Sequence, residues 1–264
     1  MLKIENVCKT FNAGTVNEKK ALKELNLHLK PGDFVTVIGG NGAGKSTMLN
    51  AVAGTWPVDE GSVLIDGVDV THLSEHKRAK YIGRVFQDPR MGTATDMWVE
   101  ENLAVADRRG LRRGLRWSIT NKDRARYKQV LSTLGLGLED RLTSKVGLLS
   151  GGQRQAVTLL MAVLREPKLL LLDEHTAALD PKTAAKVLEI TDKLITENKL
   201  TALMVTHNMR DAITHGNRLI MMHGGKIILD IRGEEKKKLT VEALLEQFSK
   251  TSGSEFASDR ALLS

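Results

Sequence analysis

The sequence has 264 residues, 41% of them hydrophobic, which suits one large α/β domain or a domain with a smaller inserted lobe. A single cysteine, Cys8, excludes an internal disulfide; no apolar run approaches the ~18 residues of a membrane span, and no signal-peptide region is expected at the N-terminus. The net charge of +7 is concentrated between Asp107 and Lys128, where nine lysines and arginines stand against two aspartates.

Apolar patterning predicts alternating strands and helices along the chain. The predicted strands cover 2–11, 21–30, 33–40, 61–67, 81–87, 168–174, 201–207 and a hairpin at 217–230. The predicted helices cover 45–54, most of 97–134, 151–166, 181–198 and 239–248. Such alternation indicates an α/β fold with a mainly parallel sheet covered on both faces.

The helical stretch near 89–150 interrupts this alternation and indicates a separate lobe. We therefore expect a core formed by 1–88 and 151–230, a helical subdomain at 89–150, and a C-terminal helix with a flexible, serine-rich tail at 231–264.

A glycine-rich phosphate loop follows the strand at 33–40. The segment GGNGAGKST (39–47) fits G-x-x-x-x-G-K-[ST], with a buried strand before it and a helix after it. Its backbone N–H groups are expected to surround phosphate oxygens, with Lys45 on the β- and γ-phosphates and the Ser46 hydroxyl on Mg²⁺. The loop therefore predicts binding of a nucleoside triphosphate.

Two adjacent carboxylates, Asp173 and Glu174, fall where the strand LLLL leaves the predicted sheet. A carboxylate at such a strand end can hold the shell of a Mg²⁺ ion, and its neighbour can polarise a water for attack on the γ-phosphorus. The alternative is that both side chains lie in solvent on a loop.

Six motifs follow one another along the chain: GGNGAGKST (39–47), Gln87 in VFQDP, LSGGQRQ (149–155), LLLLDE (169–174), AALD (177–180) and His207 in VTHN. In type and order they resemble those of the nucleotide-binding subunits of ABC transporters, over nearly the whole chain. The resemblance implies a P-loop NTPase (RecA-like) core with an N-terminal antiparallel β subdomain and an inserted helical subdomain. It also implies ATP hydrolysis with Mg²⁺, held by Ser46, Gln87 and Asp173.

The resemblance explains the second glycine loop, LSGGQ. In that family two subunits pack head to tail, so that each ATP lies between the phosphate loop of one copy and the LSGGQ segment of the other. The resemblance thus implies nucleotide contacts from Phe11 on adenine, from Asp180 across the interface, and from both loops. The loop residues concerned are Gly39, Gly40, Asn41, Gly42, Ala43, Gly44, Lys45, Ser46, Thr47, Ser150, Gly151, Gly152 and Gln153.

The implied catalytic residues are Glu174 as general base, His207 on the γ-phosphate, Gln87 and Lys45. For Phe11 a core or strand-edge aromatic is the alternative, and for His207 an unrelated strand-end histidine. The family usually has proline where this chain has His175, which either tunes Glu174 or faces solvent. We expect the latter, because adjacent strand residues point to opposite faces.

Two further patterns compete for interpretation. HLSEH (72–76) matches a zinc-protease pattern, with His72 and His76 on one helix face, although a third ligand is missing and a solvated helix is expected instead. The basic stretch 108–117 either contacts anionic lipid or acidic permease loops, or forms a solvated loop.

These observations predict an ATPase that powers a separate membrane permease and lies peripherally on the cytoplasmic face of the membrane. The expected partners are a second copy, the transmembrane permease subunits and, through the permease, an extracytoplasmic solute-binding protein. No nucleic acid is expected, and import of a small solute, such as an amino acid, is favoured. The alternatives are a soluble ABC ATPase acting on nucleic acid or ribosomes, and a non-catalytic interaction subunit.

Overall fold

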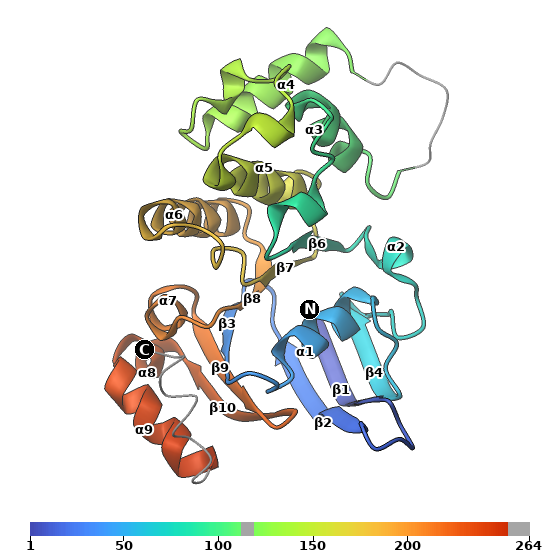
Figure 1. Ribbon diagram of the computed structural model, residues 1–264, viewed down its shortest axis with the longest axis vertical. Coiled ribbons are helices and arrows are strands. Elements are labelled where there is room, and N and C mark those ends of the chain that lie inside the picture. Colours follow the sequence, from blue (N-terminus) through green and yellow to red (C-terminus); the bar gives the residue numbers. More distant parts are fainter. Residues whose placement is uncertain (112–118, 253–264) are drawn as a thin grey trace. The chain divides into compact units, whose positions relative to one another are not determined.

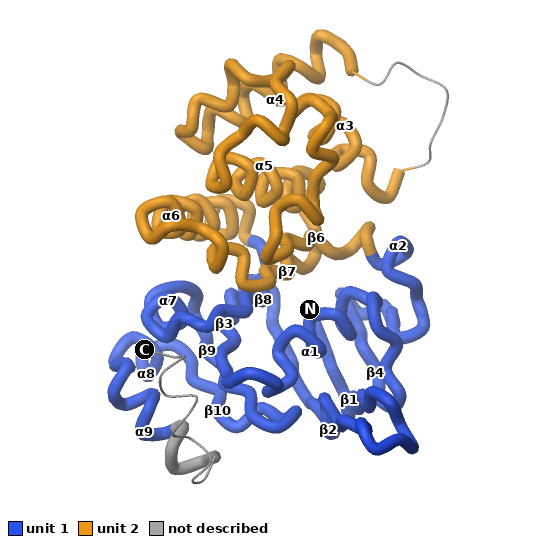
Figure 2. Tube along the Cα trace, viewed as in Figure 1, with its two compact units in different colours: residues 1–78, 200–264 blue, residues 79–199 orange. Residues whose placement is uncertain are grey.

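A computed structural model of the chain describes residues 1–111 and 119–252, with side chains up to residue 247. The chain divides into two compact units, formed by residues 1–78 with 200–264 and by residues 79–199 (Figure 2). The boundaries of these units differ from those of the expected core and helical subdomain, whose functional division stays a prediction.

Unit 1 contains two sheets with flanking helices (Figure 1). Its strands are β1 (Leu2–Phe11), β2 (Lys19–Leu29), β3 (Phe34–Ile38), β4 (Glu60–Ile65), β5 (Val68–Asp69), β8 (Thr201–Val205), β9 (Arg218–His223) and β10 (Lys226–Arg232). Its helices are α1 (Lys45–Ala53), α2 (Glu75–Arg78), α7 (Met209–Thr214), α8 (Gly233–Lys237) and α9 (Val241–Ser252).

The first sheet, in the order β2-β1-β4-β5, is antiparallel throughout, as expected for the N-terminal subdomain. In the second, β3 lies between β9 and β8 and is parallel to both, while β10 closes the edge as an antiparallel hairpin with β9. Every side chain of β3 and β8 is buried, because helices or loops cover both faces of a parallel strand.

Unit 2 combines one parallel strand pair with a group of helices. Its strands are β6 (Ile82–Val85) and β7 (Leu169–Asp173), and its α-helices are α3 (Val99–Asp107), α4 (Asn121–Ser132), α5 (Gly151–Val163) and α6 (Pro181–Glu197). Three 3₁₀ turns connect them, η1 (Pro89–Gly92), η2 (Leu138–Asp140) and η3 (Val146–Leu148). Helix α5 contacts α3, α4 and α6, so it forms the centre of this unit.

Most predicted elements are confirmed, with ends shifted by a few residues. The predicted strand at 61–67 is confirmed as β4, which runs into a turn at Asp66 and Gly67 and pairs with the short β5. The short helices α7 and α8 were not predicted, since five or six residues are too few for a helical period. Helix α9 continues to Ser252, past the predicted end at 248, and the rest of the expected tail lies outside the described residues.

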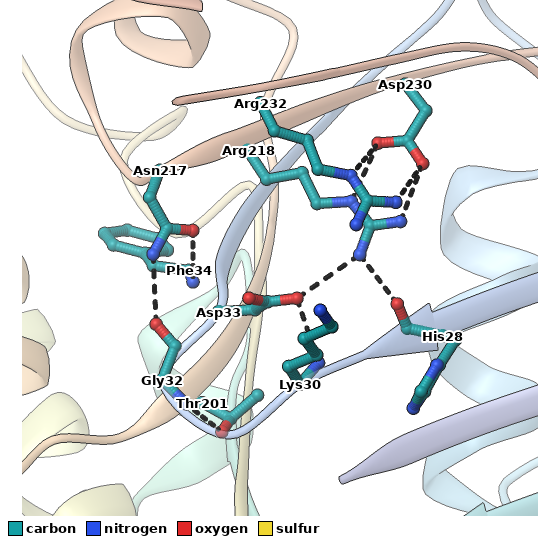
Figure 3. A network of polar contacts seen from close by, with 10 residues as sticks. All are labelled: His28, Lys30, Gly32, Asp33, Phe34, Thr201, Asn217, Arg218, Asp230 and Arg232. Atoms are coloured by element: carbon teal, nitrogen blue, oxygen red, sulfur yellow. Dashed lines mark hydrogen bonds and ion pairs between the residues drawn. The ribbon is translucent and has the colours of Figure 1, made fainter. Parts of the chain in front are cut away.

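A buried arginine joins the strands of unit 1 where β9 begins (Figure 3). Arg218 is 3% exposed and donates two hydrogen bonds to Asp230, at 2.8 and 2.7 Å. Its remaining nitrogen donates to the carbonyl of His28 at 2.7 Å and lies 3.3 Å from a carboxylate oxygen of Asp33. Arg232, whose side chain is 53% exposed, binds the same Asp230 from the solvent side.

The two arginines on Asp230 give a matched pair of stability tests. We expect Arg218→Met to lower the free energy of unfolding by about 3–5 kcal/mol, because it removes the buried cation from Asp33 and leaves Asp230 with the exposed Arg232 alone. Arg232→Met should cost no more than about 1 kcal/mol, since an exposed ion pair is screened by water. Urea unfolding of both variants measures the difference, and equal losses would contradict the assignment.

The Arg218 contribution should also depend on pH. Burial raises the pKa of Asp230, but hydrogen bonds from Arg218 and Arg232 outweigh it and leave the pKa below its ordinary value. The stabilisation is therefore fully present above the ordinary carboxyl pKa of about 4 and is lost as the pH falls through the lower folded value. The gap in unfolding free energy between wild type and Arg218→Met should narrow below about pH 4.

Candidate functional site

The phosphate loop joins β3 to α1 and is closely packed by backbone on both sides. A Cβ added at Gly39 would lie 2.2 Å from the carbonyl oxygen of Met222, and one at Gly44 would lie 2.7 Å from that of Ala21. Both glycines also have positive φ, 152° and 103°. Only glycine combines the missing Cβ with a ready positive φ, so these two positions of the loop require glycine.

Lys45 is the first residue of α1, and its ammonium group is turned back over the loop. It donates to the carbonyls of Gly39 at 2.7 Å and Gly40 at 3.1 Å, and the residue is 8% exposed. No side chain caps the start of α1, so the backbone N–H groups of its first turn have no side-chain acceptor. Ser46 follows in that turn and is exposed. The loop thus combines N–H donors, a cation and a hydroxyl.

His207 lies at the same sheet edge as the phosphate loop. Strands β3 and β8 are parallel neighbours, and their carboxyl ends lead directly to Gly39 and to His207, which is exposed. Asn208 then caps α7 by accepting hydrogen bonds from two backbone N–H groups. One helical turn after His207, burial raises the pKa of Asp211, partly offset by the charges of His215 and His207.

Phe11 ends β1 with a half-buried ring. Its ring meets that of Trp56 edge to face, with 5.0 Å between centroids. The sequence did not single out Trp56, which lies two residues after the helix-closing Gly54. The alternative of a strand-edge aromatic and the expected adenine contact are both compatible with this geometry, and the adenine contact stays a prediction.

In unit 2, Gln87 and the expected acidic residues Asp173 and Glu174 lie at the carboxyl ends of two neighbouring strands. Strands β6 and β7 are parallel, with Val85 opposite Leu172, so Gln87 and the Asp173–Glu174 pair follow equivalent ends. Asp173 lies 3.9 Å from the guanidinium of Arg84. The strand ends at Asp173, and Glu174 has a positive φ of 43°, a strained conformation that recurs at functional sites.

His175 does not face solvent, contrary to the expectation. It is 1% exposed, and its Nε2 lies 3.1 Å from the hydroxyl of Thr191 on α6. The alternation argument failed because β7 has already ended and the left-handed Glu174 turns the chain. His175 therefore ties the turn after Glu174 to α6.

The LSGGQ segment builds the start of α5. Ser150 caps the helix by accepting from the N–H of Gln153 at 3.3 Å, and Gln153 accepts from the N–H of Ser150 at 3.2 Å. A Cβ at Gly152 would lie 2.1 Å from a methyl carbon of Thr183, so glycine lets α5 approach α6. Ser150 and Gly151 remain exposed at the N-terminus of a 13-residue helix.

Two further residues have defined positions in unit 2. Asp180 caps α6 by accepting from the N–H of Thr183. Hydrogen bonds from the side chain and then the backbone of Thr183 lower the pKa of Asp180, and its expected interface role stays a prediction. Gln155, which the sequence did not single out, is fully buried and donates from Nε2 to the carbonyl of Phe86 at 3.3 Å. Gln155 therefore links α5 to Phe86, the residue before Gln87.

The competing patterns are less coherent in space. His72 precedes α2, His76 lies within it, and both are exposed, in agreement with the expected solvated helix and not with a shared helix face. Across 1–111 and 119–247, no cluster of three potential metal-binding residues occurs. Of the basic stretch, Arg109 is turned inward and donates to the carbonyl of Ala162. Arg124 and Arg126 beyond it bind Glu100 and Asp107. Residues 112–118 lie outside the described residues.

Comparison with known proteins agrees with this arrangement. Residues 22–177 match the family model described as ABC transporter. The chain is 44% identical over 248 residues to a tyrosine transport ATP-binding protein of Clostridioides difficile, covering 94% of this chain and 98% of that one. It is 38% identical over 214 residues to a methionine import ATP-binding protein of Escherichia coli, covering 79% of this chain and 59% of that protein.

Solved structures show the same fold. A dimeric ATP-binding cassette in a post-hydrolysis state with ADP and phosphate aligns with a TM-score of 0.75 at 32% identity, covering 88% of this chain and 98% of that one. A cassette of an ABC transporter in its ADP conformation aligns with a TM-score of 0.77 at 28% identity, covering 94% and 98%. These neighbours confirm the predicted P-loop NTPase fold. The chain belongs to the ABC transporter family and is an ATP-hydrolysing subunit of that family.

Proposed function

We propose that this chain binds ATP with Mg²⁺, pairs head to tail with a second copy around two nucleotides, and drives a separate membrane permease. The phosphate loop carries the proposal, because its glycine packing, N–H donors and Lys45 together form a site for a polyphosphate. The dimeric relative with ADP and phosphate supports both the nucleotide and the pairing.

The residues present suit ATP and Mg²⁺. The phosphate loop keeps its shape because positions 39 and 44 are glycine: a Cβ at Gly39 or Gly44 would clash with a neighbouring backbone carbonyl. Ser46, Gln87 and Asp173 supply a hydroxyl, an amide and a carboxylate, the oxygen donors that Mg²⁺ prefers. When bound, the ion would neutralise charge on the phosphates.

We assign the chemistry to two side chains. Glu174 would accept the proton of the attacking water, and His207 would donate to the γ-phosphate and orient that water. The positive φ of Glu174, in the turn between β7 and α6, supports its role because strained backbone recurs at functional sites. His175, bonded to Thr191, would keep that turn in place.

The start of α5 would close on the ATP held by the other copy. Ser150 and Gly151 are exposed, and the helix N-terminus presents its positive end there. Since each copy then carries half of two sites, ATP would join the dimer and hydrolysis would release it. Through its hydrogen bond to the carbonyl of Phe86, Gln155 would couple a movement of α5 to the segment that carries Gln87.

The relatives support a proposal for the partner and the cargo. Among the described residues no helix has the length and apolarity to cross a bilayer. We propose, from the membership in the ABC transporter family, that permease subunits hold the chain peripherally on the cytoplasmic face. We further propose import of a small solute of the amino-acid class, since the relatives transport tyrosine and import methionine. An extracytoplasmic solute-binding protein would act through the permease.

Removing the proposed base tests the catalytic assignment. We expect Glu174→Gln to lower the ATP turnover rate by ~10²–10⁴, because the amide cannot accept the water's proton. ATP-dependent dimers should persist, which size-exclusion chromatography with ATP and Mg²⁺ measures. Glu197→Gln, at the exposed end of α6, is the matched control and should keep its turnover. Near-normal hydrolysis by Glu174→Gln would reject the assignment.

A bulky cation at the signature loop tests the shared site. Ser150→Arg should abolish ATP-dependent dimers and turnover while leaving ATP affinity of the single copy within about twofold, because the side chain blocks closure and not the phosphate loop. Ser132→Arg, at the exposed end of α4, is the matched control. The idea of a shared site would be wrong if Ser150→Arg still dimerised and hydrolysed ATP normally.

A further inference from the structure

Lys19, the first residue of β2, places an ammonium group beside the phosphate loop. A Cβ added at Gly42 would lie 3.2 Å from Lys19 Nζ. Gly42 and Lys19 are both exposed, and Gly42 lies at the turn of the loop with a φ of 75°. Throughout the part of the chain with described side chains, no hydrogen bond or ion pair engages this ammonium. It is thus available to an anion bound in the loop.

The backbone that carries Lys19 is anchored to the loop at several points. The carbonyl of Ala21 lies against Gly44, and the N–H of Lys23 donates to the carbonyl of Gly225 at 3.1 Å. Gly225 in turn donates to the carbonyl of Ala43 at 3.1 Å. The beginning of β2 therefore keeps its position beside the phosphate loop, and only the flexible side chain of Lys19 has to adjust to a ligand.

Neighbouring charges distinguish Lys19 from the other lysines at this end of unit 1. Lys9 is neutralised by Asp59 at 2.8 Å, and its ammonium lies 5.7 Å from the centre of the Phe11 ring. Lys20 follows Lys19 on the strand and points to the opposite face, since side chains alternate. Lys45 holds the loop's own carbonyls, so Lys19 adds a second cation from another side.

Lys19 also lies on the Phe11 side of the loop. The two residues are direct partners in the β1–β2 pairing. If Phe11 contacts the base, Lys19 lies between the base and the loop, whereas Lys45 is expected on the β- and γ-phosphates. The position therefore suits the α- and β-phosphates.

We propose that Lys19 is a nucleotide-binding residue of this chain, which donates from Nζ to oxygens of the α- and β-phosphates. The proposal rests on the ATP site described above. It adds a contact from the N-terminal sheet, on the strand opposite the aromatic residue, so the sheet holds base and phosphates through neighbouring residues.

Nucleotide affinities of two neighbouring variants test the proposal. We expect Lys19→Gln to weaken both ATP and ADP by about tenfold, because a hydrogen bond to a charged group is lost. Lys20→Gln should bind both within about twofold of wild type. Isothermal titration of the full chain measures the affinities, and thermal unfolding without nucleotide should give the same midpoint for both variants.

The outcomes separate this proposal from the ATPase assignment. If wild type and Lys19→Gln bind ATP equally well, the Lys19 contact is rejected while the ATP site stands. A loss for ATP without a loss for ADP would overturn the assignment to the α- and β-phosphates. If wild type itself binds no ATP, the proposed function fails and Lys19 has no nucleotide to contact.

Discussion

Close backbone packing around the phosphate loop is the constraint on which the rest of unit 1 depends. The carbonyls of Ala21 and Met222 occupy the space that side chains at Gly44 and Gly39 would need. The loop is therefore shaped by the strands beside it as much as by its own sequence. Because β3 and β8 are parallel, the same packing sets His207 at the loop's edge. A sheet edge with outward N–H groups and a cation is suited to a phosphate chain.

In unit 2, close packing likewise fixes the positions of the helices. Gly152 lets α5 approach Thr183 of α6, and the Ser150–Gln153 capping box leaves the helix N-terminus exposed. Gln155, on the same helix, holds the carbonyl of Phe86. Any displacement of α5 would thus act on the segment that carries Gln87, because a buried amide resists losing its partner. The LSGGQ segment therefore also fixes the packing of its own unit.

The local periods of the chain predicted most strands and helices, the motif at 39–47 predicted the phosphate loop, and the family resemblance implied the antiparallel N-terminal sheet. The local patterns failed where an element is too short to show a period, and where the surrounding structure sets a residue's orientation. Helices α7 and α8 are too short for a period. His175 was expected in solvent because strand alternation was carried one residue too far. The basic stretch was counted as one surface, yet Arg109 is turned into the unit, because its long side chain reaches a carbonyl of α5.

The sequence by itself determined the class of chemistry, since glycine, lysine and carboxylate motifs at strand ends act through their local backbone. It could not show that Trp56 meets Phe11, that Gln155 holds Phe86, or that Lys19 extends toward Gly42. These residues lie between 23 and 69 positions from their partners in the sequence. Only the tertiary structure brings them together, because contacts across strands and between helices depend on register and packing, which no local pattern encodes.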